Sequence, residues 1–314
     1  MKNINILLIG LGNMGKVHKR IIENTKNVSL VGILDSSFND NLSTENKVKH
    51  YKKFNQINFD TEKIDGVVIS STTASHYALA KKILDLNIPV LIEKPVSTKI
   101  SEVIELVNIS RVKNTILRAG LIEIYNPIFE HIKKLNLKDI ISIHTFRHSQ
   151  QVGKERKLEN VIHDLVLHDI SVLFYLFKDL NLSIAGKLTS SKNRVIESSE
   201  LLLNHNKVNI FISSSRQSQL KIRKWNILTN DELYQIDLIE KKIDIYKAGK
   251  VKFSSSNLVS EKSNLSTLSF SNHPETAQIQ FNAFISNIID SNIDNEHLQI
   301  LEKSHEFVSK VNLH

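Results

Sequence analysis

Cysteine is absent from the whole 314-residue sequence. Disulfide bonds, thiolate metal ligands and cysteine nucleophiles are therefore excluded, and a reducing cytoplasm is the compartment that suits such a chain. Long apolar runs are absent too, because no stretch approaches the roughly 20 residues that cross a bilayer. The apolar start of the chain ends in a glycine pattern instead of a small-residue cleavage site, which indicates a strand and not a signal peptide. The sequence thus predicts a cytoplasmic protein without a membrane-spanning segment.

The sequence also has no long basic run, although its formal net charge is +8. The lysines are scattered, and the longest basic runs are pairs such as Lys52-Lys53 and Lys81-Lys82. A nucleic-acid partner would require a basic patch or stripe, so none is expected. The positive charge reflects either a general bias toward lysine or an anionic cofactor or substrate, and both interpretations stay open.

Apolar runs and helical segments alternate through the first 121 residues. Strands are predicted over residues 4–9, 28–35, 65–72, 89–95 and 115–121, and helices from about residue 14, over 75–87 and over 101–113. This alternation is typical of βαβ units with right-handed crossovers in a parallel sheet. We therefore predict an α/β fold with a doubly wound Rossmann domain over residues 1–121.

The second half of the chain has a different pattern. Helices are predicted over residues 128–135, 161–177, 276–289 and 296–311, with extended segments between 182 and 247. LLLN-HNK-VNIF and IDLIE-KK-IDIYK look like hairpins, which indicates antiparallel pairing. The serine-rich residues 254–271 are expected to be an exposed connector. Residues 122–314 are thus predicted to form one α+β domain with a largely antiparallel open sheet, for substrate binding and oligomerisation.

Three of the nine glycines fall within six positions of LLIGLGNMGKVHKR, residues 7–20. Gly10, Gly12 and Gly15 fit GxGxxG between a strand and a helix, where they allow a tight turn, close approach of a pyrophosphate and close helix packing, respectively. The amides at the start of that helix attract phosphate groups. A glycine turn that serves chain geometry alone is the alternative.

Asp35 closes the second predicted strand. A carboxylate at this place accepts hydrogen bonds from the adenosine ribose hydroxyls and repels a 2′-phosphate. The next residues, Ser36 and Ser37, supply no cation for such a phosphate. NAD is therefore expected over NADP, unless an arginine from elsewhere in the chain reverses the preference.

Lys94, in the sequence Glu93-Lys94-Pro95, lies at the carboxyl end of a predicted buried strand. Open α/β sheets bind their ligands at the carboxyl ends of the strands, so this lysine is a candidate for the chemistry. An ordinary surface lysine is the alternative.

The stretch VIHDLVLHDI, residues 161–170, carries a second candidate group. His163 and His168 are five residues apart and do not form the HExxH zinc motif, and no metal site is predicted. Asp164 and His168 are four apart and would share one face of an α-helix, where the carboxylate could tune the imidazole for proton transfer. The helix is apolar nearly all round, which indicates burial. Two incidental histidines on an ordinary helix are the alternative.

Together GLGNMG, EKP and HDLVLHDI resemble the Gfo/Idh/MocA family of glucose-fructose oxidoreductases and inositol dehydrogenases. The similarity covers nearly the whole chain. GNMGKVHKR, EIYNP and RKWNILTNDELYQIDL most resemble its nucleotide-sugar members, of the UDP-N-acetylglucosamine 3-dehydrogenase type. One departure is Thr72-Thr73, where many relatives carry proline and threonine.

The resemblance implies a role for each candidate residue. Lys94, Asp164 and His168 would be catalytic: His168 takes the hydroxyl proton, Lys94 stabilises the developing charge on that oxygen, and Asp164 orients the substrate or the imidazole. The implied NAD site comprises Gly10, Gly12, Asn13, Met14, Gly15, Asp35, Thr72, Thr73, His76, Glu93 and Lys94. The implied substrate site comprises Asn126, Lys154, Arg156 and His168. Asn126 as a simple helix cap, His76 as a packing residue and a solvated loop around Lys154 are the alternatives.

The predicted function is oxidation of a secondary hydroxyl of a sugar by NAD, with a nucleotide sugar oxidised at C3 as the leading substrate. A dehydrogenase of a free sugar or inositol is one alternative, and a non-catalytic NAD-binding sensor is another. Retention of a proton acceptor argues against the sensor. The family resemblance further implies a homodimer or homotetramer.

Overall fold

The computed structural model describes residues 3–38, 43–45, 48–135, 139–150, 159–177, 179–192, 195–247, 249, 251–254, 257–260 and 264–313. Lys154 and Arg156 lie outside the described residues. The chain divides into two compact units. The first contains residues 1–125 and 274–309, and the second contains residues 126–273 and 310–314.

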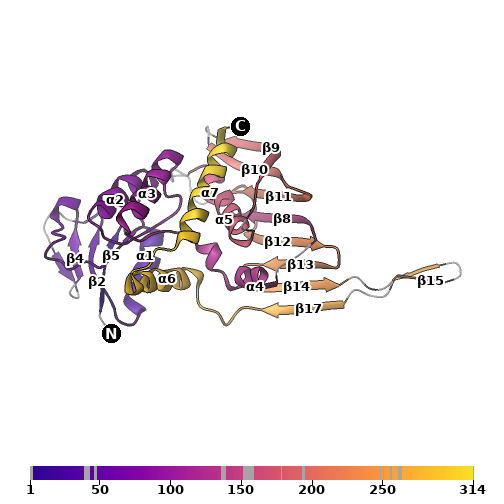
Figure 1. The fold of residues 1–314 in the computed structure, drawn as a ribbon, viewed down its shortest axis with the longest axis horizontal. Coiled ribbons are helices and arrows are strands. Elements are labelled where there is room, and N and C mark those ends of the chain that lie inside the picture. The colour runs from indigo at the N-terminus through magenta and orange to yellow at the C-terminus, as the bar shows by residue number, and fades with distance from the viewer. Residues whose placement is uncertain are drawn as a thin grey trace. The chain divides into compact units, whose positions relative to one another are not determined.

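A seven-stranded sheet forms the centre of the first unit, in the described residues (Figure 1). Its order is β3-β4-β2-β1-β5-β6-β7, and all neighbours are parallel except β3 and β4. The strands are β1 (Ile4–Ile9), β2 (Val28–Leu34), β3 (Ser43–Glu45), β4 (Val48–Tyr51), β5 (Gly66–Ile69), β6 (Val90–Ile92) and β7 (Leu117–Ala119). The helices between them are α1 (Asn13–Asn24), α2 (Thr73–Asp85) and α3 (Ile100–Lys113). The Rossmann prediction is confirmed.

The strands form because their side chains are apolar on both faces, as a covered parallel sheet requires. Ile6, Leu8, Val67 and Val68 are fully buried. The short strands β3 and β4 were not predicted. Their sequences STE and VKHY lack an apolar run, and the pairing of β4 with β2 places them at the edge of the sheet.

The structure corrects the predicted division of the chain in one respect. Residues 274–309, which were assigned to the second domain, belong to the first unit. They comprise α6 (Thr276–Asp290) and most of α7 (Asn295–Leu313). Phe281 and Phe284 of α6 lie in one apolar cluster with Ile6 and Leu8 of β1. Helical periodicity reveals an apolar face but not which core that face will join, so the spacing alone could not show this.

The second unit is built on an eight-stranded sheet of order β17-β14-β13-β12-β8-β11-β10-β9. Figure 1 shows these strands side by side. They are β8 (Ile140–His148), β9 (Ser183–Lys192), β10 (Val195–His205), β11 (Val208–Ser215), β12 (Ile222–Thr229), β13 (Glu232–Asp237), β14 (Lys242–Lys247) and β17 (Asn264–Ser269). Only β8 and β11 pair in parallel, in the described residues, so the predicted antiparallel α+β domain is confirmed.

Residues 254–271 were expected to be a connector, and this expectation is wrong for much of the segment. β17 pairs with β14 as the edge strand, and β15 (Val251–Ser254) pairs with β16 (Asn257–Ser260) in a separate two-stranded sheet. The serine and asparagine residues make the strand pattern around the leucines at 265 and 268 hard to recognise in the sequence. The pairing register places Leu268 opposite Ile243. An edge strand pairs with a neighbour on one side only, and polar residues are common in such strands.

One face of the second sheet is covered by α4 (Pro127–Leu135) and α5 (Leu167–Leu176). Trp225 of β12 is buried and meets Phe129 of α4 edge-on, with ring centroids 4.9 Å apart. In the described part of the chain, no helix is long and apolar enough to cross a membrane.

Candidate active site

The glycine loop after β1 has the shape that the sequence predicts. Gly10 has φ +91°, and a Cβ there would lie 2.6 Å from the Ser71 amide nitrogen. A Cβ on Gly15 would lie 2.1 Å from the Gly10 carbonyl oxygen. Gly12 differs, because nothing lies within 4 Å of its missing Cβ, and it precedes the first turn of α1. Two glycines therefore serve packing, and the third leaves open space at a helix N-terminus, which fits a pyrophosphate.

Asn13 and Met14 are the first two residues of α1, immediately after Gly12. The loop is held in place by the neighbouring strand β5, since the Ser70 hydroxyl donates to the Gly10 carbonyl oxygen at 2.9 Å. Thr72 and Thr73 follow at the start of α2. The structure thus brings the predicted glycine and threonine positions to the carboxyl edge of one sheet.

Asp35 follows β2 and turns its carboxylate to the glycine loop. Its Oδ2 accepts the Leu11 amide at 2.6 Å, and its Oδ1 accepts the Ser37 amide at 2.9 Å. Partial burial on its own would raise the pKa of Asp35, but the hydroxyl and amide of Ser37 and the amide of Leu11 outweigh it and lower the pKa. The side chain is therefore an anion beside the loop, where ribose hydroxyls can still donate to its remaining lone pairs.

Glu93, Lys94 and Pro95 follow β6 at the same edge of the sheet. Glu93 Oε1 lies 2.7 Å from His18 Nε2, and Glu93 Oε2 accepts the Lys94 amide at 3.3 Å. The Lys94–Pro95 peptide bond is cis. His76, expected near the cofactor, is buried and turns both ring nitrogens to backbone carbonyl oxygens. Contact of Glu93 or His76 with the cofactor stays a prediction.

The predicted helix over 161–177 is not a uniform α-helix. Residues Ile162–Val166 form a π-helical turn, in which the Leu167 amide donates to the Ile162 carbonyl five residues back. The face-sharing of Asp164 and His168 assumed 3.6 residues per turn, and this assumption fails across the π turn. Asn160 precedes the turn, and its Oδ1 accepts the amides of Ile162 and His163 at 2.8 and 3.2 Å.

Asp164 is paired with Arg216, a residue at the end of β11 that sequence reasoning missed. Arg216 Nη2 and Nε lie 3.1 and 3.3 Å from Asp164 Oδ2. The Arg216 side chain is buried, and its Nη1 is 3.8 Å from Glu197 Oε2. The Asp164 side chain is 35% exposed. A guanidinium favours the ionised carboxylate, so Asp164 is held as a hydrogen-bond acceptor.

His168 is buried and directly precedes Asp169, whose carboxylate accepts several hydrogen bonds. Asp169 Oδ1 accepts Arg147 Nε and Nη2 at 3.0 and 2.8 Å and Trp225 Nε1 at 3.2 Å. The carboxylate is fully buried and ties α5 to strands β8 and β12. The sequence offered one signal for it, an acid on a helix that is apolar nearly all round. Burial also lowers the pKa of His163, six residues before Asp169 in the sequence.

Asn126 begins the second unit and caps α4. Its Oδ1 accepts the Ile128 amide at 3.1 Å, and its carbonyl oxygen accepts the Phe129 amide at 2.9 Å. The simple-cap interpretation is therefore realised, and a substrate contact stays a prediction. Asn126, Asp164 and His168 belong to the second unit, whereas Lys94 belongs to the first.

A buried polar network lies behind β7 in the first unit. Arg118 donates to the Tyr125 hydroxyl and, at 2.8 Å, to Asp294 Oδ2. His297 Nε2 accepts the Ala119 amide at 2.8 Å, and burial next to Arg118 lowers the pKa of His297 to about 3. The neutral ring therefore accepts this bond across the working pH range, and the network fixes the segment that ends at Tyr125.

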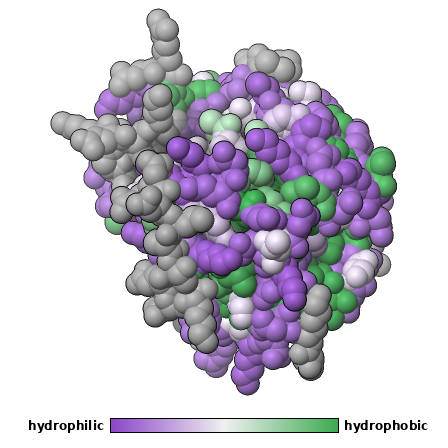
Figure 2. Space-filling model, turned by 90° about the vertical axis from the view of Figure 1, so that its left-hand side faces the viewer, coloured by the Kyte–Doolittle hydropathy of each residue, from purple (hydrophilic) through white to green (hydrophobic). Residues whose placement is uncertain are grey.

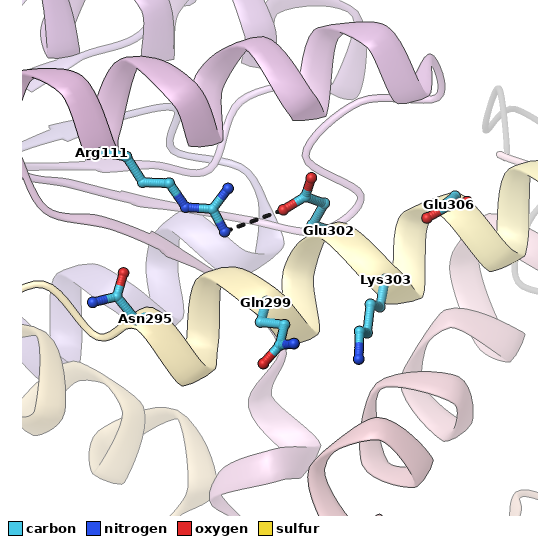
Figure 3. Close-up of a pocket in the computed structure, with 6 residues that line it drawn as sticks. All are labelled: Arg111, Asn295, Gln299, Glu302, Lys303 and Glu306. Carbon is cyan, nitrogen blue, oxygen red and sulfur yellow. Dashed lines mark hydrogen bonds and ion pairs between the residues drawn. The ribbon is translucent and has the colours of Figure 1, made fainter. Parts of the chain in front are cut away.

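A surface groove between α3 and α7 holds none of the predicted site residues (Figure 3). It is lined by polar and charged side chains of both signs: Arg111, Asn295, Gln299, Glu302, Lys303 and Glu306. Arg111 and Glu302 form an ion pair at 3.2 Å. The surface shown in Figure 2 is likewise mostly hydrophilic, with hydrophobic residues in separate patches. Among the described residues, no cluster of histidine, aspartate or glutamate could hold a metal ion.

Comparison with known proteins identifies the first unit. Residues 4–121 match the model of GFO_IDH_MocA, described as an oxidoreductase family with an NAD-binding Rossmann fold. Residues 4–121 belong to the Gfo/Idh/MocA family. The glycine loop and Asp35 fit the cofactor that this family binds, and the protein is an NAD(P)-dependent oxidoreductase.

Individual similar proteins extend the similarity beyond residue 121. The UDP-N-acetylglucosamine 3-dehydrogenase of Acidithiobacillus ferrooxidans is 20% identical over 250 residues, which cover 77% of this chain and 76% of that protein. A crystal structure of the enzyme of that name, GnnA, has a TM-score of 0.78 at 16% identity and covers 100% of this chain and 98% of its own. KijD10, a 3-ketoreductase of Actinomadura kijaniata solved with NADP, has a TM-score of 0.81 at 12% identity, over 99% and 97% of the two chains. The fold is thus shared along the whole chain.

Proposed function

We propose that this oxidoreductase removes hydride from a secondary hydroxyl of a nucleotide-linked sugar, at C3 of a substrate like UDP-N-acetylglucosamine, with NAD as its cofactor. The observation that carries the proposal is the placement of Lys94. This lysine lies two residues after β6, at the sheet edge where the glycine loop and Asp35 also lie. An ammonium group beside the expected nicotinamide position is suited to stabilise an oxygen from which a proton is leaving.

The cofactor site uses residues of the first unit. Gly12 and the start of α1 would hold the pyrophosphate, and the Asp35 carboxylate would hold the adenosine ribose. The bound nicotinamide ring supplies the hydride acceptor. The lowered pKa of Asp35 supports NAD over NADP, because an anion at this place repels a 2′-phosphate.

Two residues have complementary proposed roles toward the hydroxyl group. His168 takes the hydroxyl proton, and Lys94 donates a hydrogen bond to the same oxygen. Asp164 orients the substrate or the imidazole and does not carry the proton, since Arg216 occupies one of its oxygens with two N–H groups. General base catalysis of this kind contributes about 10²- to 10⁴-fold to a rate.

The names of two relatives support the substrate class. One is a UDP-N-acetylglucosamine 3-dehydrogenase and the other a 3-ketoreductase, which has also been crystallised with TDP-benzene and NADP. Both names refer to position 3, and both proteins take a nucleoside diphosphate group. For this chain, Lys154 and Arg156 stay the proposed contacts of that group, and Asn126 stays a proposed part of the floor of the substrate site.

The function is tested by NADH absorbance with a panel of UDP-sugars, free sugars and inositols. We expect NADH formation with a UDP-sugar and little with the free compounds. A response to free sugar or inositol alone would replace the nucleotide-sugar assignment. NAD binding without turnover on any of them would instead favour a sensor.

Asp35→Ala is expected to weaken the preference for NAD over NADP by about tenfold, the scale of one hydrogen bond to a charged group. The affinity for NAD itself should also fall, because the Leu11 amide loses its acceptor. Asp35→Asn, which keeps the size without the charge, should give an intermediate ratio. The measurement is kcat/KM for both cofactors, and an unchanged ratio in both variants would place the ribose elsewhere.

We further propose that the protein forms a homodimer or homotetramer through the second sheet. The pairing register puts Leu188, Leu202, Leu228 and Leu265 on the face opposite the helices, where 38–74% of each side chain is exposed. Replacing Leu202 and Leu228 by lysine is expected to shift the mass in light scattering toward the monomer. Leu220→Lys, at an equally exposed position outside the sheet, should leave the mass unchanged. A monomeric unmodified protein would contradict this proposal.

A further inference from the structure

We propose that three buried histidines, His18, His76 and His305, act together as positioning residues for the segment that carries Lys94. The segment comprises residues 93–96, and each histidine comes from a different helix of the first unit. This inference rests on the proposed catalytic role of Lys94.

His18, from α1, holds the residue before Lys94. Its Nε2 lies 2.7 Å from Glu93 Oε1, and both side chains are buried. The other carboxylate oxygen accepts the Lys94 amide. Gly120, after β7, backs the same carboxylate, since a Cβ there would lie 2.8 Å from Glu93 Oε2. These contacts hold the Glu93 side chain in one position, and the Lys94 backbone amide is hydrogen-bonded to it.

His76, from α2, holds the residue after Lys94. Its Nδ1 lies 2.9 Å from the Pro95 carbonyl oxygen, and its Nε2 lies 3.0 Å from the Ser71 carbonyl oxygen. Carbonyl oxygens only accept hydrogen bonds and a neutral imidazole has one N–H, so the ring donates to one of the two oxygens at a time. The buried ring thus lies between the segments that follow β5 and β6 and contacts both.

His305, from α7, holds the next residue along. Its Nδ1 lies 2.9 Å from the Leu301 carbonyl oxygen and must donate there. The Nε2 is then the acceptor of the neutral ring, and it receives the Val96 amide at 3.2 Å. The bond to Leu301 therefore sets the tautomer that binds the segment.

The three contacts fix the backbone on both sides of Lys94. The exposed fractions of His18, His76 and His305 are only 1%, 1% and 3%. Buried imidazoles are costly compared with aliphatic side chains unless each polar atom gains a partner. Five of the six ring nitrogens have such a partner in this four-residue segment, in the neighbouring strand end or in the helix turn, whereas the buried His18 Nδ1 has none among the described residues. A displacement of about 1 Å at a reacting group can cost about 10²-fold in rate, so rigid support of Lys94 favours turnover.

The first test compares leucine, which fills the space of the histidine without its hydrogen bonds, with glutamine, which can still form a hydrogen bond at the place of Nε2. His18→Leu and His305→Leu are each expected to lower kcat about tenfold or more, with KM for NAD nearly unchanged. His18→Gln and His305→Gln should recover much of kcat, because the glutamine amide reaches the place of Nε2 and can donate to Glu93 or accept from Val96. Ser110→Ala, which removes a buried hydrogen bond to Thr115 elsewhere in the unit, should lower stability without changing kcat.

A double-mutant cycle separates positioning from general damage. In the Lys94→Ala background, His18→Leu is expected to lower kcat by less than about twofold, since there is no longer an ammonium to position. Independent, multiplicative losses would overturn the inference. Wild-type turnover of Lys94→Ala would instead overturn the proposed catalytic role of Lys94, on which this inference rests.

His76 supplies a test that does not depend on the leucine variants folding. His76→Asn keeps a donor at the place of Nδ1, toward Pro95, whereas His76→Gln keeps one at the place of Nε2, toward Ser71. We expect the asparagine variant to retain the higher kcat. Equal kcat for the two variants, or a higher value for glutamine, would show that the bond to the segment does not matter.

Discussion

Lys94→Ala and His168→Ala are each expected to lower turnover by about 10²-fold or more while the affinity for NAD stays nearly unchanged. The proposed substrate oxygen loses its hydrogen-bond donor in the first variant and its proton acceptor in the second. Neither change touches the glycine loop or Asp35, which is why binding should survive. Steady-state kinetics with NAD binding by calorimetry measures the two quantities separately.

Two matched substitutions control this experiment. Lys99→Ala removes a lysine of the same unit whose side chain is 72% exposed and pairs with Glu102, and His273→Ala removes an exposed histidine. Both should retain full turnover. Full turnover of Lys94→Ala and His168→Ala as well would refute the assigned roles.

Arg147→Met is expected to lower the free energy of unfolding by about 3–5 kcal/mol, because it leaves the Asp169 carboxylate buried without its cation. The two side chains are 3% and 1% exposed, so water cannot replace the lost partner. Urea unfolding measures the change. Lys134→Met, which breaks a surface pair with Glu130, should stay within about 0.5 kcal/mol. A loss below 1 kcal/mol in Arg147→Met would mean that the anchor of α5 lies elsewhere.

The double variant Arg147→Met with Asp169→Leu refines this prediction. Removing both charges avoids the unpaired carboxylate, so part of the lost stability should return. Recovery of stability without recovery of turnover would show that Asp169 also serves the neighbouring His168. Equal instability of the single and double variants would attribute the loss to the packing of Arg147 alone.

The sequence predicted those parts of the fold that depend on local pattern. The apolar run over residues 4–9 is β1, with the predicted bounds, and Gly10, Gly12 and Gly15 form the expected loop. The two proposed hairpins in the second half are also present, as β10–β11 and β13–β14. Side-chain periodicity and glycine geometry are properties of neighbouring residues, which is why they can be deduced from the sequence.

The missed features depend on partners far away in the sequence. Arg216 lies 52 residues from Asp164, and His305 lies 209 residues from Val96. Spacing on one helix could not reveal the π turn at Ile162–Val166, which replaced the assumed geometry between Asp164 and His168. Each of these contacts arises only when two elements pack, so a pattern within one element carries no trace of it.

Helix α6 belongs to the first unit although it comes late in the sequence, and this has a consequence for folding during synthesis on the ribosome. Phe281 and Phe284 complete the apolar cluster around Ile6 and Leu8, although 270 or so residues of translation separate them. The dinucleotide-binding unit therefore stays unfinished until its last helices emerge, whereas the continuous stretch 126–273 is available to fold earlier. A fragment that stops at residue 121 lacks α6, so we expect it to expose the apolar surface that α6 covers and to aggregate.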